Sequence, residues 1–394
     1  MSNISLLTKP AQSGKTATLL NEFAISYDEK LINLIFVDNS KLQANQLKTR
    51  IETHCGLEQY ESSNGNKCLV LTSETKINID TVFRKICREN YKIIIMCSHC
   101  ERIKQADELI KDLTNYNFKI IIDEADKNLK LFDEKISEWK TAKNIFNIEL
   151  ITATPDKIIN KFSDIKIIQN KTSYDEDIYH SFSECDFLLL RVEGDNTKYH
   201  DYIETVIEHY KEKIENGQVW FIPGETNVDS HNKIKDVLKT YGFCVFVING
   251  DKKKLYYEDK IFEIPCSDND SIGEIIGKMY QSHNLINKKI AITGNKCINR
   301  GITIHSKNML ITHAIFPTKS TNEDNDYQLA GRICGNIKKF KKYKKPFVIC
   351  GKHFKNAVES KEMNVSTINN ANLTADAELS NIKSVVITKT IMYK

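Results

Sequence analysis

Residues 4–16 read ISLLTKPAQSGKT, an apolar run of strand length that is followed at once by a turn and by Gly14-Lys15-Thr16. An apolar helical stretch begins at about residue 17, so the pattern predicts a strand, a tight turn and a helix N-terminus in succession. Such an arrangement aims backbone N–H groups and the positive end of a helix dipole at one point. These residues predict a phosphate-binding loop, with an ordinary strand-to-helix turn as the alternative.

The side chains of this loop suit a triphosphate bound with magnesium. Gly14 lets the backbone approach the phosphates closely, Lys15 can reach the β and γ phosphates, and the Thr16 hydroxyl can ligate Mg²⁺. Gln12 and Ser13 belong to the same predicted nucleotide site. The match to the full loop pattern is confined to its Gly-Lys-Thr end.

A second apolar run, Ile120–Ile122, ends in Asp123-Glu124-Ala125-Asp126. Because parallel strands end at the same edge of a sheet, we expect these acids beside the phosphate loop. In a nucleotide hydrolase, Asp123 would join the Mg²⁺ shell, and Glu124 would orient and deprotonate the attacking water. The alternative is a helix N-terminus that carries acids because the helix dipole favours them there.

Apolar runs of strand length recur along the whole chain, with helix-length stretches between them. Runs such as Ile93–Cys97 show no polar alternation, which is typical of parallel strands that are covered on both faces. Polar residues between about 168 and 183 interrupt this rhythm, which then resumes. We therefore predict an α/β protein with two domains, at residues 1–175 and 183–358, and a polar tail or small appended element at residues 359–394.

Composition excludes few classes of protein. The formal net charge of +4 in 394 residues gives no global argument for a polyanionic partner. No apolar run approaches the roughly 20 residues that span a bilayer, and residues 1–10 lack a signal-peptide pattern, so we expect a cytoplasmic or otherwise intracellular protein without a membrane partner. The 11 cysteines have no regular spacing, which favours reduced thiols.

The Gly-Lys-Thr loop followed by Asp-Glu-Ala-Asp resembles the superfamily 2 helicases and translocases of DEAD/DEAH-like type. The resemblance implies two tandem RecA-like domains, each a mostly parallel sheet with helices on both faces, that hold ATP and nucleic acid between them. It implies ATP and Mg²⁺ as cofactors, DNA or RNA as the partner, and other proteins as the source of targeting. The heavy use of Ile, Lys and Asn is compatible with a viral or plasmid type, found in the host cytoplasm or virion.

Further motifs of this family can be recognised in the first half of the chain. Residues 151–155, ITATP, resemble the family's Ser/Thr-Ala-Thr motif, so Thr152, Thr154 and Asp126 are implied to couple hydrolysis to movement. Residues that follow the apolar runs Leu34–Val37 and Ile93–Cys97 stand where the family contacts nucleic acid. They are Asn39, Lys41, Ser98 and Arg102.

The second half carries three more matches in the family's order. Residues 219–224, VWFIPG, and 291–294, AITG, resemble segments that contact the nucleic-acid backbone, with Gly224 and Thr293 as the implied contacts. Residues 327–335, YQLAGRICG, resemble the arginine-finger motif. The resemblance implies nucleotide contacts for Arg300 and Gly301, and catalytic roles for Gln328 and Arg332, the latter as a finger on the γ-phosphate.

The chain departs from the family pattern at three positions. Gly335 stands where a second arginine is usual, Thr303 where an acid is common, and Lys9 where the loop pattern has glycine. Arg332 is then the only finger, which predicts hydrolysis that is slow or depends on a partner.

Residues 338–345, KKFKKYKK, form a basic run with interleaved aromatics. Such a run can neutralise several phosphates and stack on bases. The candidate contacts are Lys338, Lys339, Lys341 and Lys342. A solvated surface loop is an equal alternative.

Three other interpretations stay open on the sequence. Cys97-Ser98-His99-Cys100 could hold zinc, but a single Cys-x-x-Cys falls short of four ligands. The fold could serve as a nucleic-acid clamp or assembly subunit in which hydrolysis has decayed, which Gln12, Thr303 and Gly335 favour. A packaging-type ATPase of the terminase kind shares the loop and the acidic motif, although no clustered nuclease acids follow them.

Overall fold

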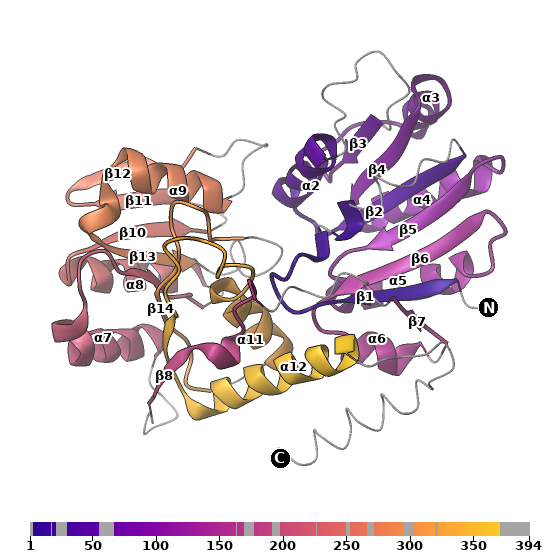
Figure 1. Cartoon of the computed structure of the whole chain (residues 1–394). Helices are drawn as coiled ribbons and strands as arrows, with labels where there is room; N and C mark the ends of the chain where they lie inside the picture. Colours follow the sequence, from indigo (N-terminus) through magenta and orange to yellow (C-terminus); the bar gives the residue numbers. More distant parts are fainter. Residues whose placement is uncertain are drawn as a thin grey trace. The chain divides into compact units, whose positions relative to one another are not determined.

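The computed structural model describes residues 3–16, 18–20, 30–54, 67–162, 164–168, 177–190, 198–225, 227–249, 253–265, 272–294, 303–319 and 322–370. The chain forms two compact units (Figure 1). Unit 1 comprises Met1–Lys9, Gly14–Ser173 and Val365–Lys394, and unit 2 comprises Pro10–Ser13 and Tyr174–Asn364. The change from unit 1 to unit 2 after Ser173 lies inside the polar stretch at residues 168–183.

Unit 1 is built on a seven-stranded sheet in the order β3-β4-β2-β5-β6-β1-β7, in which every pair is parallel. The strands are β1 (Ile4–Thr8), β2 (Leu31–Val37), β3 (Lys67–Leu71), β4 (Tyr91–Cys97), β5 (Asn117–Ile122), β6 (Ile145–Thr152) and β7 (Lys166–Ile167). Because β6 lies between β5 and β1, the three strands that carry the predicted motifs end side by side.

Helices cover both faces of this sheet. They are α2 (Lys41–His54), α3 (Ile79–Glu89), α4 (Cys100–Asp112), α5 (Ala125–Trp139) and α6 (Asp156–Lys161). Helices α3 to α6 share one apolar core with the sheet, in which Phe36 packs against Phe132 and Trp139 at ring-centroid distances of 4.8 and 6.1 Å. Helix α2 and residues 19–20 form a second core on the other face.

Unit 2 is built on an eight-stranded sheet in the order β12-β11-β10-β13-β9-β14-β15-β8. The strands are β8 (Asp186–Leu189), β9 (Val219–Phe221), β10 (Phe243–Ile248), β11 (Lys253–Tyr257), β12 (Lys260–Glu263), β13 (Lys289–Gly294), β14 (His313–Ile315) and β15 (Phe347–Cys350). All pairs are parallel except two, since β11 pairs antiparallel with β10 on one side and with β12 on the other. The sequence did not predict β11 and β12, because these two strands carry charged residues and lack an apolar run.

The helices of unit 2 also cover both faces of its sheet. They are α7 (Tyr199–Tyr210), α8 (Val228–Thr240), α9 (Ile272–Ser282), α11 (Glu323–Ala330) and residues 352–364 of α12 (Lys352–Asn370), with short 3₁₀ turns at η1 (Phe182–Glu184), η2 (Lys211–Lys213), η3 (Leu285–Asn287) and η4 (Gly331–Ile333). Trp220 packs in the core beneath α7 and α8. Phe221, its neighbour in β9, contacts Phe316 at 5.9 Å, away from that core. The predicted α/β class with mostly parallel sheets is confirmed.

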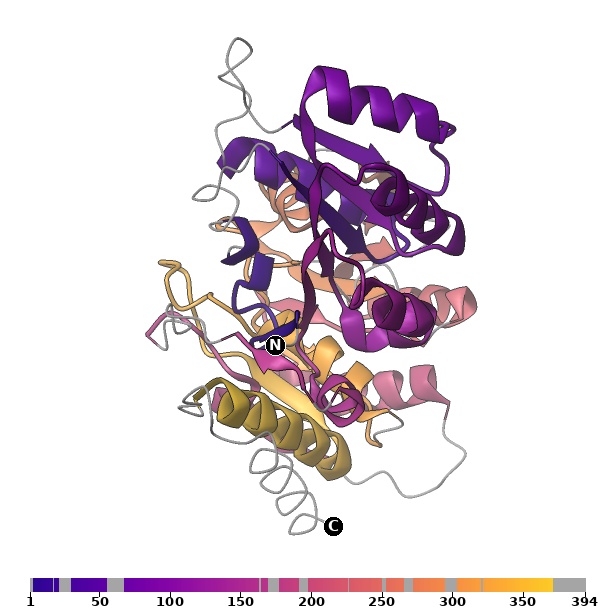
Figure 2. The same ribbon diagram turned by 90° about the vertical axis from the view of Figure 1, so that its right-hand side faces the viewer.

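Helix α12 continues past the predicted end of the second domain at residue 358. Figure 2 shows it as one continuous coil, in yellow. Its buried residues Phe354, Val358, Val365 and Ile368 recur at helical spacing, which explains why the helix persists through a stretch that is polar overall. Residues 371–394, the rest of the predicted tail, lie outside the described part. No helix in the described residues is long and apolar enough to cross a bilayer.

Candidate active site

The acidic motif lies at the end of β5, where the half-buried Asp123 precedes the first turn of α5. Burial raises the pKa of Asp123, and the positive charge of Lys15 opposes this shift. The backbone N–H of Glu124 donates to Asp123 Oδ1 at 3.0 Å, whereas the charges of Asp126 and Asp38 raise the pKa further. The charge of Lys15, in the Gly-Lys-Thr segment, therefore acts on the carboxylate of Asp123.

Glu124 is held in an uncommon backbone conformation. It caps α5 with φ 49° and ψ 46°, the left-handed region, and it is buried. A non-glycine residue in this region costs roughly 1–3 kcal/mol, and such strain clusters at functional sites. The local turn thus fixes the orientation of the residue that the sequence predicts as the base.

The three residues that were expected to couple hydrolysis to movement form one buried hydrogen-bonded group. The Thr152 hydroxyl, at the end of β6, donates to Asp126 Oδ1 at 2.6 Å. The backbone N–H of Thr154 donates to Thr152 Oγ1 at 2.9 Å. We call Asp126, Thr152 and Thr154 the threonine cluster. It links the acidic motif directly to the Thr-Ala-Thr segment inside unit 1.

The predicted phosphate loop turns tightly on itself. The backbone N–H and the hydroxyl of Ser13 both donate to the carbonyl of Pro10, at 3.2 and 2.7 Å. Gly14 follows with φ 97°, a conformation that favours glycine. Lys9, the departure from the loop pattern, is buried and donates from Nζ to Thr18 Oγ1 at 2.9 Å. The lysine therefore braces the start of the helix.

The residues predicted for Mg²⁺ fit that ion. Thr16 offers a hydroxyl oxygen and Asp123 a carboxylate oxygen, and Mg²⁺ usually takes one or two carboxylates together with phosphate and water oxygens. The described residues contain no group of three or more His, Cys, Asp or Glu side chains that could form an all-protein metal site. This donor set matches an ion that arrives with a nucleotide.

The zinc interpretation of Cys97–Cys100 finds no support among the described residues. Burial raises the pKa of the Cys97 thiol, which disfavours the thiolate that zinc needs. His99 Nδ1 instead accepts from the backbone N–H of Glu101 and caps α4.

Two predicted nucleic-acid contacts hold buried hydroxyls without a hydrogen-bond partner in the described part of the chain. They are Ser98 Oγ, after β4, and Thr293 Oγ1, at the end of β13. An unpaired buried polar atom lowers the stability of the fold by roughly 1–3 kcal/mol, so its presence needs an explanation, such as a ligand that binds there and supplies the missing partner. Asn39 and Lys41 are exposed, and Lys41 pairs with Glu74 at 3.6 Å.

Arg102 requires a correction. The side chain is only 2% exposed, and its Nε and Nη2 donate to the carbonyl of Thr72 at 3.0 and 2.6 Å. Nη2 also donates to the carbonyl of Thr75, and Nη1 to Gln105. This buried guanidinium holds the segment after β3, and the geometry speaks against a contact with nucleic acid.

The lysine run is only partly available for a polyanion. Lys338 forms an ion pair with Glu184 at 2.7 Å, which offsets its charge and speaks against a primary phosphate contact. Lys339, Lys341 and Lys342 are exposed.

Gly224, another predicted nucleic-acid contact, is in the turn after β9. A Cβ at this position would come within 2.2 Å of the His231 ring, so the turn requires glycine.

The arginine-finger motif forms α11 and η4 of unit 2. Arg332 is 2% exposed in η4. Gln328 is also buried, and its Nε2 has no hydrogen-bond partner among the described residues. Arg300 and Gly301, the other predicted nucleotide contacts of this half, lie outside the described part of the chain.

Three residues of this region were missed by the sequence analysis. Thr8, at the end of β1, has a buried hydroxyl with no hydrogen-bond partner in the described part. Tyr179 and Tyr327 bind the backbone of Ala11 in the phosphate loop. A polar residue at the end of an apolar strand could have indicated Thr8, but no local pattern indicates the tyrosines.

Neither a family model nor a curated protein sequence matches this chain. The Mycobacterium smegmatis helicase Lhr bound to ssDNA and AMP-PNP aligns with 93% of this chain and 46% of its own, at 12% identity and a TM-score of 0.52. The Escherichia coli DEAH/RHA helicase HrpB aligns over 99% and 48%, at 10% identity and a TM-score of 0.52. The DEAD-box helicase Mss116 bound to ssRNA and UDP-BeF aligns over 99% and 74%, at 14% identity and a TM-score of 0.50.

This chain spans less than half the length of the first two of these structures. At identities this low, the structural similarity establishes a common fold and no more. The shared features are the two mostly parallel sheets with helices. The chain therefore shares the fold of these three helicase structures, in which two mostly parallel α/β sheets match tandem RecA-like domains.

Proposed function

We propose that this chain is a nucleic-acid-dependent ATPase that acts as a helicase or translocase on DNA or RNA. The observation that carries the proposal is that β1, which precedes the Gly-Lys-Thr segment, and β5, which precedes Asp123, are parallel strands on either side of β6 and so end at the same edge of the sheet. Burial raises the pKa of Asp123, and the charge of Lys15 opposes this rise. A basic group and a carboxylate held at the end of a parallel sheet are what a Mg²⁺-bound triphosphate requires.

In this proposal the residues of unit 1 divide the work of hydrolysis. Lys15 binds the β and γ phosphates, while Thr16 and Asp123 would hold the Mg²⁺ that neutralises phosphate charge. Glu124 orients and deprotonates the attacking water, and its strained turn keeps it in place. Gln328 and Arg332 belong to unit 2. In this proposal they take the catalytic roles that the sequence resemblance implies, Arg332 by placing positive charge on the γ-phosphate.

The proposed nucleic-acid contacts rest on the polar groups that the protein leaves unpaired and on exposed charge. Ser98 and Thr293 have buried hydroxyls without partners among the described residues, and Asn39, Lys41, Lys339, Lys341 and Lys342 are exposed. Lhr and Mss116 were solved with ssDNA and ssRNA, which supports a polynucleotide as the partner without choosing between the two.

The test is steady-state ATP hydrolysis with Mg²⁺, alone and with single-stranded DNA, duplex DNA or RNA. One polymer is expected to stimulate the wild type, and Glu124→Gln should lower kcat by roughly 10²- to 10⁴-fold because the general base is lost. Lys15→Ala should abolish ATP binding. Lys104→Ala and Glu101→Gln, which change exposed residues of α4, are the matched controls.

Hydrolysis that is indifferent to every polymer would contradict the motor proposal. An unchanged rate in Glu124→Gln would contradict the assigned base. Metal-dependent cleavage of duplex DNA would instead favour the packaging-type alternative.

A second candidate is a nucleic-acid clamp that binds ATP without turning it over. It is favoured by Gly335, since a Cβ there would lie 2.8 Å from the Cβ of Gln12 and 3.1 Å from its carbonyl oxygen. The position therefore excludes the second arginine of the family pattern. Tight binding of nucleic acid in the presence of ATP, with no phosphate released over many binding half-lives, would support this candidate.

A further inference from the structure

The first half of the phosphate loop, Pro10–Ser13, belongs to unit 2, whereas Gly14 begins the part that belongs to unit 1. Within unit 2 two tyrosines bind the backbone of Ala11, one at its N–H group and the other at its carbonyl group. The backbone N–H of Ala11 donates to the Tyr327 hydroxyl at 3.1 Å, and the Tyr179 hydroxyl donates to the carbonyl of Ala11 at 3.0 Å. All three residues are buried. We call this arrangement the Ala11 clamp.

Two glycines of the arginine-finger motif make room for the clamp. A Cβ at Gly331 would lie 2.6 Å from the Cβ of Ala11. A Cβ at Gly335, which has φ 118°, would lie 2.8 Å from the Cβ of Gln12. The Oε1 of Gln12 accepts from the Thr303 hydroxyl at 2.9 Å. Gln12 therefore lies against both Thr303 and Gly335. These three are the residues that, in the sequence, favour a protein that binds ATP without hydrolysing it.

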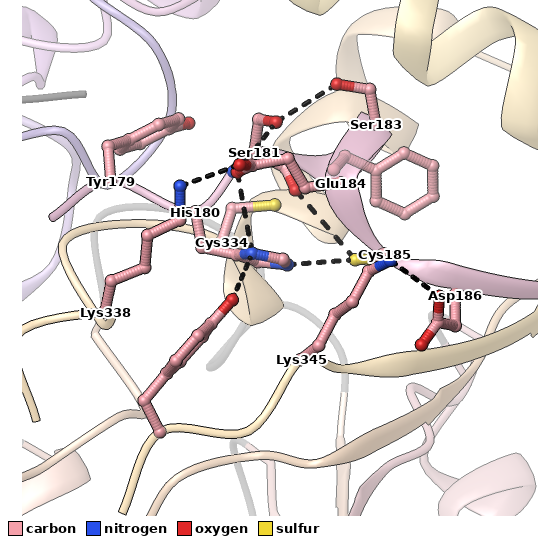
Figure 3. A network of polar contacts seen from close by, with 12 residues as sticks. Tyr179, His180, Ser181, Ser183, Glu184, Cys185, Asp186, Cys334, Lys338 and Lys345 are labelled. Carbon is pink, nitrogen blue, oxygen red and sulfur yellow. Dashed lines mark hydrogen bonds and ion pairs between the residues drawn. The ribbon is translucent and has the colours of Figure 1, made fainter. Parts of the chain in front are cut away.

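A second set of contacts positions Tyr179. His180, the next residue, exchanges backbone hydrogen bonds with Gly335 at 2.8 and 3.0 Å. Figure 3 shows the buried ring of His180 in contact with the sulfur of Cys185, at 3.3 Å. Tyr343 Oη lies 2.9 Å from His180 Nδ1. The segment that carries Tyr179 is therefore braced by the finger motif and by the lysine run.

In this conformation of the loop, backbone N–H groups that a phosphate would use already donate to other acceptors. A phosphate loop works by aiming several backbone N–H groups at the anion. Here the N–H of Ala11 donates to Tyr327, and the N–H of Ser13 donates to Pro10. Gln12, between them, has φ 59°, which is uncommon for a residue with a side chain. A bound triphosphate must compete with these internal acceptors.

We propose that Tyr179 and Tyr327 are positioning residues that hold Pro10–Ser13 in a conformation closed to nucleotide, so that ATP binds only when the clamp opens. The proposal rests on the proposed function of this loop as the ATP site. A ligand that needs a minor conformation binds with an affinity reduced by the population of that conformation. Weakening the clamp therefore strengthens ATP binding.

The test compares the wild type with the double variant Tyr179→Phe/Tyr327→Phe, which keeps both rings and removes both hydroxyls. Calorimetric titration with AMP-PNP and Mg²⁺ should give a Kd that is roughly fivefold lower in the double variant, since each hydrogen bond contributes modestly. Tyr202→Phe is the matched control, because Tyr202 is also buried in unit 2 and donates to the carbonyl of Phe316 at 3.2 Å. Its Kd should equal that of the wild type.

Hydrogen exchange adds a readout that needs no nucleotide. The backbone amides of residues 11–13 should exchange faster in the double variant than in the wild type or in Tyr202→Phe, because local opening sets the exchange rate. Unchanged exchange, or a Kd that is equal or higher in the double variant, would overturn the clamp while leaving the proposed ATPase intact. Failure of every form to bind nucleotide would instead overturn the proposed function, and the role of the clamp with it.

Discussion

The threonine cluster of unit 1 and the Ala11 clamp of unit 2 are both buried polar groups, but they are built differently. The cluster joins side chains of two sequence motifs, with Thr152 donating to Asp126 at 2.6 Å. The clamp joins two tyrosine hydroxyls to the backbone N–H and carbonyl groups of Ala11, and glycines allow this backbone to come close. A cluster of motif residues can be found from the sequence, whereas a clamp on the backbone can be found only from the fold.

The largest expected effect comes from closing the space that the clamp needs. Gly335→Ala should lower the free energy of unfolding by about 3 kcal/mol, because the new Cβ meets Gln12 and the residue keeps its φ of 118°. Urea denaturation measures this loss. It would show that close contact with the loop is part of the stability of unit 2.

The matched control separates steric contact from backbone strain. Gly242 has φ 78°, and a Cβ there meets nothing within 4 Å. Gly242→Ala should therefore cost only about 1 kcal/mol, the price of the left-handed conformation. Equal losses in the two variants would mean that Gln12 does not lie against Gly335 in solution.

A smaller effect is expected in the threonine cluster. Thr152→Val keeps the shape of the side chain but removes the hydroxyl that donates to the buried carboxylate of Asp126, so it should cost about 2 kcal/mol. Urea denaturation is again the measurement. Thr141→Val, at an exposed hydroxyl that donates to the carbonyl of Glu138, should cost less than about 0.5 kcal/mol. A neutral Thr152→Val would show that the cluster is not formed.

The smallest effect is a pH dependence in the segment that carries Tyr179. Burial lowers the pKa of His180 to about 4, aided by Lys338 and Lys345 and opposed by Glu184. Between pH 6.5 and pH 4 the unfolded chain binds a proton that the folded chain does not, so stability should fall as the pH falls. At pH 5.5 the protonation of His180 in the unfolded chain should lower the free energy of unfolding by about 1 kcal/mol relative to neutral pH.

Urea denaturation at several pH values measures this slope. His180→Gln should reduce it without removing it, since burial also lowers the pKa of His305 and of His313 to about 4. The exposed His353 provides the control, and His353→Gln should leave the slope unchanged. A slope that is identical in His180→Gln and the wild type would mean that His180 is not buried in solution.

Much of the fold could be predicted because its signals are local. Apolar runs without polar alternation gave the parallel strands, and Gly14, Lys15, Asp123 and Glu124 follow those strands within a few residues. The hairpin of β11 and β12 was missed, since its strands carry lysines and glutamates and Glu258 turns the chain with φ 54°. The continuation of α12 to Asn370 was also missed, because its buried face occupies few positions of a polar stretch.

The sequence alone determined that the chain has two α/β units and which motif residues end the strands of unit 1, because strand and turn preferences depend on neighbouring residues. Only the tertiary structure decided that Arg102 is buried against carbonyls, that Lys338 pairs with Glu184, and that Ala11 lies between two tyrosines. Tyr179 and Tyr327 are 168 and 316 residues from Ala11 along the chain. The partner of a buried polar group is set by which distant segments pack together, and no local preference encodes that choice.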